Sequence, residues 1–62
     1  MFDLKGFRQN ILNLTQEEFA TLIDERQDAI SRMEKNPEQI NLMILQKIAN
    51  KTGMTLDQLV GF

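Results

Sequence analysis

The side chains best suited to bind a polar ligand lie between residues 24 and 36. This segment is rich in charged and amide side chains, and Ile30 and Met33 are spaced to face inward from one helix. Gln27, Ser31 and Arg32 then lie toward the outward face of that helix. Glutamine pairs bidentately with N6 and N7 of adenine, and arginine with O6 and N7 of guanine, in the DNA major groove. The spacing therefore predicts a helix whose outer face could contact base edges.

The composition argues against other kinds of site. The 62-residue chain contains no histidine and no cysteine, which removes the usual zinc ligands, the most frequent general base and any disulfide. No loop has the Asp, Asn and Gly spacing of a calcium site. No nucleophile–base arrangement or phosphate-binding loop is visible in the sequence. We expect neither an enzyme nor a bound metal, cofactor or small-molecule ligand.

The sequence gives no indication of a membrane or secreted protein. Its longest apolar run, residues 42–45, is far shorter than the roughly 20 residues that span a bilayer. Residues 1–5 lack the basic-then-apolar pattern of a secretion signal. We expect no membrane association and a cytoplasmic location.

The net charge of −2 sets a condition on any role in DNA binding. Neutralisation of phosphates by lysine and arginine supplies much of the affinity of DNA-binding proteins. The basic residues must therefore be clustered. Arg26, Arg32 and Lys35 fall in one segment and make it locally positive. Acidic residues that can lie elsewhere are Glu17, Glu18, Glu38 and Asp57.

Helical periodicity is the main structural pattern, because valine occurs once and tyrosine and tryptophan are absent. Leu4, Phe7 and Ile11 form one face of a first expected helix. The second opens with a capping box in which Thr15 and Glu18 each satisfy a backbone N–H of the other. The expected inward-facing residues of the next three helices are Phe19, Leu22 and Ile23, then Ile30 and Met33, and then Leu42, Leu45, Ile48 and Ala49.

Local signals also mark the remaining helix ends. Pro37 disfavours helical geometry at the preceding residue and stops the third helix. Asn41 is the expected N-cap of the fourth helix, and Gly53 its left-handed end. A second capping box, Thr55 with Gln58, opens a short fifth helix. We expect an all-α, compact five-helix domain over residues 1–62.

Three motifs in register resemble the Cro/Xre family of phage-repressor-like helix-turn-helix domains. They are Thr-Gln-Glu-Glu-Phe-Ala at residues 15–20, Ile-Ser-Arg-Met-Glu at residues 30–34, and Ile-Ala at residues 48–49 followed by Gly-Met-Thr-Leu-Asp-Gln-Leu at residues 53–59. The pattern aligns without a gap from Thr15 to Leu59. The first helix joins it with a one-residue insertion before Leu14.

The resemblance implies a role for particular residues. Gln16 is similar to the family's glutamine that binds a DNA phosphate and braces the recognition helix. Arg8 and Glu34 resemble the family's ion pair between the first and third helices. Together with the outward face described above, the resemblance implies a DNA-binding site of Gln16, Arg26, Gln27, Asp28, Ser31, Arg32, Lys35 and Asn36.

The turn between the second and third helices departs from the family pattern. Asp24 replaces the usual glycine, and aspartate tolerates left-handed geometry better than most residues. Glu25 replaces a small apolar residue, so its carboxylate must reach solvent, pair with Arg26 or Lys35, or shift the turn. Arg26 replaces the usual Ser or Thr cap. Alternatively, Asp24 caps a recognition helix that starts earlier.

These features together predict a transcriptional regulator, a repressor, that binds double-stranded DNA. We expect a homodimer whose two recognition helices reach half-sites one helical turn apart. Leu59, Val60 and Phe62 either close the core or form the two-fold contact. The alternative is a protein-interaction module that keeps the fold without binding DNA, because the total charge is acidic and Glu25 and Asp28 lie near the reading face.

Overall fold

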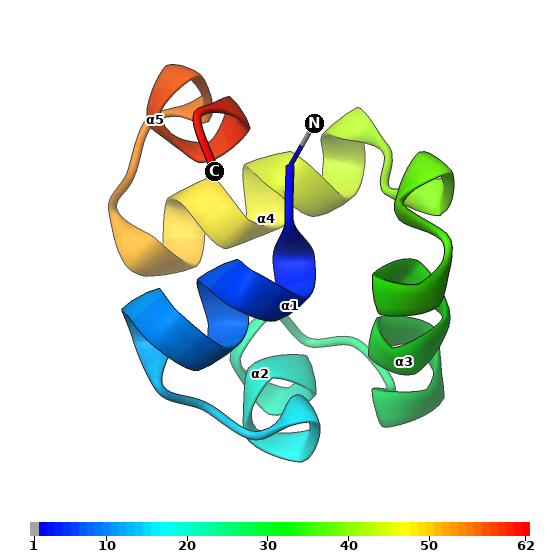
Figure 1. Ribbon diagram of the computed structural model, residues 1–62. Helices are drawn as coiled ribbons and strands as arrows, with labels where there is room; N and C mark the ends of the chain where they lie inside the picture. The colour runs from blue at the N-terminus through cyan, green and yellow to red at the C-terminus, as the bar shows by residue number, and fades with distance from the viewer. Residues whose placement is uncertain (1) are drawn as a thin grey trace.

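The chain folds into five short α-helices joined by tight turns, shown in a computed structural model that describes residues 2–62 (Figure 1). The elements are α1 (Leu4–Gly6), a π-helical segment (Phe7–Leu12), α2 (Gln16–Leu22), α3 (Gln27–Lys35), a 3₁₀ turn (Pro37–Gln39), α4 (Leu42–Thr52) and α5 (Leu56–Val60). Residues 2–62 contain no strand. The predicted all-α, five-helix fold is confirmed.

The helix ends lie where local chemistry places them. Thr15 Oγ1 accepts from the Glu18 N–H at 3.1 Å, and Glu18 Oε1 accepts from the Thr15 N–H at 2.9 Å. Thr55 and Gln58 repeat both bonds at the start of α5. Gly53 ends α4 with φ = 77°, a conformation open to glycine because it has no Cβ. Both predicted capping boxes and the left-handed glycine are confirmed.

The first helix differs from the prediction because it widens into the π-helical segment Phe7–Leu12. Backbone hydrogen bonds there join residues five apart rather than four. The wider turn brings Leu12 round toward the side of the helix that carries Phe7, and Leu12 packs against the core, whereas Ile11 is 47% exposed. The prediction that Ile11 faces inward is wrong for this reason.

The inner face of α4 is rotated from the predicted one. Asn41 caps the helix as expected, accepting from the Ile44 N–H at 3.0 Å. Ile44 and Ile48 are buried one turn apart, and Leu45 packs partly against the core. Leu42 lies two residues before Ile44, about 200° around the helix axis, and is 59% exposed. The prediction of an inward-facing Leu42 is therefore wrong.

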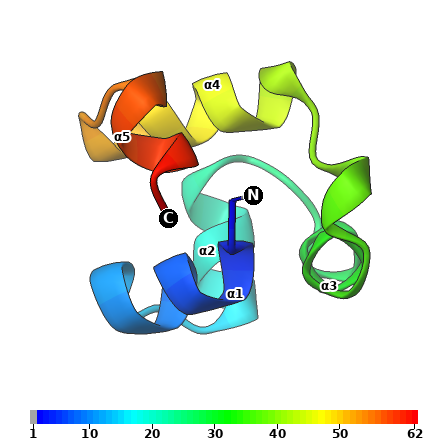
Figure 2. The same ribbon diagram turned by 45° about the horizontal axis from the view of Figure 1, so that its top comes forward.

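The core lies between α4 and α5 on one side and the other helices on the other (Figure 2). Its fully buried large side chains are Leu4, Phe7, Phe19, Ile23, Ile30, Ile48 and Leu59. Phe2 and Phe62, near the two ends of the chain, both pack against Phe7. The Phe7 ring centroid lies 5.4 Å from that of Phe2 and 5.2 Å from that of Phe62. This core fixes α2 against α3 and leaves the outer surface of α3 free.

Candidate nucleic-acid interface

The turn between α2 and α3 is built from three charged residues. Asp24 has φ = 60°, so the aspartate adopts the left-handed geometry expected at this position. The Glu25 N–H donates to Ala20 O at 2.8 Å, which closes the end of α2. Arg26 is extended and is the N-cap of α3, but its side chain makes no capping bond. Because α3 begins at Gln27, the alternative in which Asp24 caps an earlier start is wrong.

The carboxylate of Glu25 pairs with Lys47 of α4. Both side chains are partly buried, and the contact is also a hydrogen bond from Lys47 Nζ to Glu25 Oε2. Neither expected partner, Arg26 or Lys35, is used, because the turn directs Glu25 toward α4 rather than along α3. The pair compensates the partial burial of the Glu25 carboxylate, and it ties the turn to α4.

A buried network joins α2, α3 and the first helix. Arg8 Nε donates to Glu34 Oε2 at 2.6 Å, and Arg8 Nη2 donates to Glu34 Oε1 at 3.2 Å. Arg8 Nη1 donates to Leu14 O at 2.8 Å. Gln16 Nε2 donates to Glu34 Oε1 at 3.0 Å. The side chains of Arg8 and Glu34 are only 6% and 5% exposed. The expected ion pair is present, and Gln16 braces α3 through Glu34.

The electrostatics of this network favour the charged form of Glu34. Burial acts to raise the pKa of its carboxyl group, because desolvation disfavours the anion. Hydrogen bonds from Arg8 and Gln16, together with the charges of Arg8 and Lys5, outweigh that effect and lower the pKa below its ordinary value. Glu34 is therefore a fixed negative charge that orients Arg8 and Gln16 at neutral pH.

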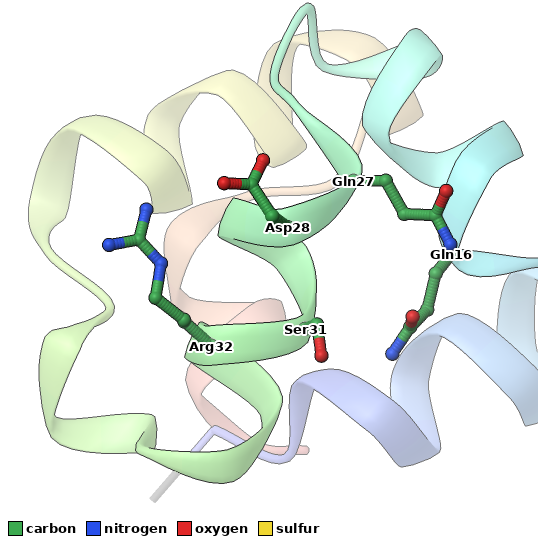
Figure 3. A pocket seen from close by; sticks show the side chains of 5 residues that line it. All are labelled: Gln16, Gln27, Asp28, Ser31 and Arg32. Atoms are coloured by element: carbon green, nitrogen blue, oxygen red, sulfur yellow. The ribbon is translucent and has the colours of Figure 1, made fainter.

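The outer face of α3 borders a shallow pocket of about 460 Å³ (Figure 3). Its lining residues are Gln16, Gln27, Asp28, Ser31 and Arg32. Gln27 and Ser31 lie on the side of α3 that faces Gln16, whereas Asp28 and Arg32 extend from the other side (Figure 3). Hydrogen-bond donors and acceptors from two helices thus converge on one open surface.

The other candidate residues lie around this surface. Arg26 Nε lies 3.4 Å from Asp28 Oδ1, but the two side chains are 89% and 66% exposed, so water largely screens this ion pair. Lys35 is exposed at the opposite end of α3. Asn36 Nδ2 turns back toward Arg32 O at 3.4 Å. Arg26, Lys35 and Asn36 therefore flank the pocket rather than line it.

Two lysines near this surface were not singled out from the sequence. Lys5 lines a second pocket together with Lys35. It precedes Arg8 by three residues, a helical spacing that places both on one side of the first helix and could have identified it. Lys47 reaches the turn from α4, and no local spacing relates it to Glu25. Only the packing of α4 against the turn brings those two charges together.

Residues 2–62 contain no group of three or more acidic, histidine or cysteine side chains that could hold a metal ion. In the same range, none of the helices has the length and apolar character needed to cross a membrane.

The family of the chain is identified by comparison with known proteins. A model of the helix-turn-helix family matches residues 4–59, which is nearly the whole sequence. No curated protein and no solved structure was found to match the chain. The matched range includes both helices of the motif, the turn and the closing helices. The chain therefore belongs to the helix-turn-helix family, of the Cro/C1 type.

Proposed function

We propose that residues 1–62 form one domain that inserts α3 into the major groove of duplex DNA and represses transcription. The observation that carries this proposal is the convergence of Gln16, Gln27, Ser31 and Arg32 on one open surface. The major groove is about 12 Å wide and admits an α-helix. The amide, hydroxyl and guanidinium groups on that surface match the hydrogen-bonding groups of base edges and phosphates.

The charge on α3 supports an anionic partner even though the whole chain is acidic. Arg8 neutralises Glu34, and Arg26 lies beside Asp28. Arg32 and Lys35 have no carboxylate within 4.0 Å among residues 2–62. The exposed surface of α3 therefore carries net positive charge where the DNA would lie.

Each candidate residue receives a role from its position. Gln27 and Arg32 contact base edges, as adenine and guanine readers respectively. Gln16 uses one amide hydrogen to bind Glu34 and keeps the second for a DNA phosphate. Lys35 approaches the backbone beyond the end of α3. The remaining flanking contacts are Arg26, Asp28, Ser31 and Asn36, of which Asp28 can accept from cytosine N4.

Selection of binding sites from random duplex DNA tests this function. We expect an enriched palindromic site and an affinity that falls steeply as salt rises. On that site, Arg32→Ala should cost about 1–3 kcal/mol at one base position, whereas Gln16→Ala should weaken binding to all sequences. Lys51→Ala is the control, because Lys51 is exposed at the end of α4 that lies away from α3 (Figure 1). Absence of binding at low salt would refute the proposal and favour a protein-interaction module.

We also propose that the protein acts as a homodimer. Leu59 is fully buried and belongs to the core, so it is not available for the contact. Val60 and Phe62 remain 55% and 41% exposed near the end of the chain. These two apolar side chains are the proposed two-fold contact, which would place two copies of α3 on adjacent half-sites.

A further inference from the structure

A second pocket, of about 190 Å³, lies between the first helix and α3. Its lining residues are Lys5, Arg8, Gln16, Ser31, Glu34 and Lys35. Its volume exceeds the roughly 30 Å³ that one water molecule occupies in the liquid. There is space for a phosphate group together with its remaining waters.

The charge of this pocket is positive at its rim and neutral at its base. Arg8 and Glu34 form the nearly buried base and satisfy each other by hydrogen bonds. Lys5 and Lys35 are exposed, and neither forms an ion pair with a carboxylate among residues 2–62. Lys5 and Lys35 both line the pocket together with Glu34, and the positive charge of Lys5 helps to lower the pKa of the Glu34 carboxyl group. Two unpaired ammonium groups thus border one small cavity.

The pocket adjoins the surface proposed to bind bases. Gln16 and Ser31 line both pockets, so the two are neighbours along α3. A duplex whose major groove receives α3 has its sugar–phosphate backbone along the sides of that helix. The pocket between α3 and the first helix therefore lies where one backbone strand would pass.

We propose that Lys5 and Lys35 together hold one phosphate of the DNA backbone in this pocket. This inference rests on the proposed DNA-binding function and adds the first helix to the interface. The contact is independent of base sequence, because phosphates carry no direct sequence information. The contact fixes the position of the DNA backbone beside α3. The buried Arg8–Glu34 pair joins the first helix, which carries Lys5, to α3, which carries Lys35, and keeps the two helices at a constant separation.

The salt dependence of binding tests the role of Lys5. Each neutralised phosphate contributes about 0.9 to the slope of log affinity against log salt for duplex DNA. Because Lys35 remains beside the same phosphate, Lys5→Gln combined with Lys35→Gln should lower that slope by about one contact, and the affinity deficit of this double variant should shrink about three- to fourfold between 50 and 200 mM salt. Lys5→Gln alone should lower the slope by a smaller amount. Lys51→Gln removes the same charge from an exposed position away from α3 and should leave the slope unchanged. An unchanged thermal midpoint shows that Lys5→Gln remains folded.

A backbone scan then identifies the phosphate. Duplexes are prepared in which one phosphate at a time is replaced by an uncharged methylphosphonate. At the phosphate that Lys5 contacts, the methylphosphonate should weaken DNA binding by the wild type but cause little further loss of affinity in Lys5→Gln. At every other position, the two proteins should lose the same amount of affinity. If the wild type binds DNA and Lys5→Gln shows the same salt slope and the same response to each methylphosphonate as the wild type, the Lys5 contact is refuted and the proposed DNA binding stands. If the wild type does not bind DNA, the proposed function fails, and this inference fails with it.

Discussion

Glu34 shows how one buried carboxylate organises residues from three elements. It accepts hydrogen bonds from Arg8 and Gln16 while it is almost completely enclosed. Removing one partner of a buried ion pair leaves the other charge without compensation. The residue therefore matters both for stability and for the orientation of the Gln16 amide that is proposed to meet DNA.

The pH dependence of stability should report this carboxylate. Its pKa is lower in the folded protein than its ordinary value of 4.5, so the unfolded chain takes up its proton first as the pH falls. Its contribution is therefore complete above pH 4.5 and is lost as the pH decreases through the folded pKa. Glu34→Gln should cost about 3–5 kcal/mol at pH 7 and should flatten the decrease in stability below pH 4.5.

Urea unfolding between pH 3 and 7 measures this effect. Glu38→Gln, the same change at an exposed position, should follow the wild-type profile. If Glu34→Gln and Glu38→Gln proved equally stable at pH 7, the network would contribute nothing beyond a surface contact.

At the scale of elements, the turn between α2 and α3 is the least regular part of the motif. Asp24 occupies left-handed space, and Glu25 depends on Lys47 of α4 for its partner. The geometry of the helix-turn-helix is kept although its usual glycine and apolar residues are absent. Backbone conformation at one residue and a contact from a distant helix together replace the chemistry that the family normally places in the turn.

Substitutions at Asp24 should depend on this backbone conformation. At φ = 60° a Cβ costs about 1–2 kcal/mol, so Asp24→Gly should be more stable than Asp24→Ala by about 1 kcal/mol. Asn50, exposed within α4, is the matched control and should show the opposite order, because glycine in a helix interior costs about 1 kcal/mol relative to alanine. In a domain of this size, 1 kcal/mol corresponds to about 4–8 °C in the thermal midpoint. The same order at both positions would contradict a left-handed Asp24.

Across the whole molecule, ion pairs explain how the surface along α3 can be positive although the total charge of the chain is negative. Three acidic side chains, Glu25, Asp28 and Glu34, are paired with basic ones. Of the basic residues without such a partner in residues 2–62, Lys5, Arg32 and Lys35 border the pockets along α3. A net charge of −2 is therefore compatible with a surface that attracts DNA.

The proposed dimer should depend on Val60. Burying a carboxylate in an apolar contact is costly, so Val60→Asp should raise the dimer dissociation constant about tenfold or more, which is 1.4 kcal/mol or more. Affinity for a palindromic site should fall while binding to one half-site persists. Met43→Asp changes another exposed apolar residue, 64% exposed on α4, and is the control. Sedimentation that shows equal association of the wild type and Val60→Asp would contradict this contact.

Apart from the π-helical segment, the helices and their ends were predictable from local residue patterns. Capping boxes at Thr15 and Thr55 and the left-handed Gly53 depend on bonds between residues three or four apart, and such short-range chemistry can be read directly from the order of residues. The pairing of Arg8 with Glu34, 26 residues apart, could be expected only through the family resemblance. The outward residues of α3 followed from its buried Ile30 and Met33.

The contacts between elements follow from tertiary packing rather than from local sequence. The π-helical turn rotates Ile11 outward, and the packing of α4 exposes Leu42. Glu25 meets Lys47, 22 residues away, and Lys5 comes to border the same pocket as Lys35. These outcomes depend on how helices are rotated and packed, which local spacing does not encode. The outer face of α3 was therefore predictable from the sequence, whereas the lysine beside it from the first helix required the fold.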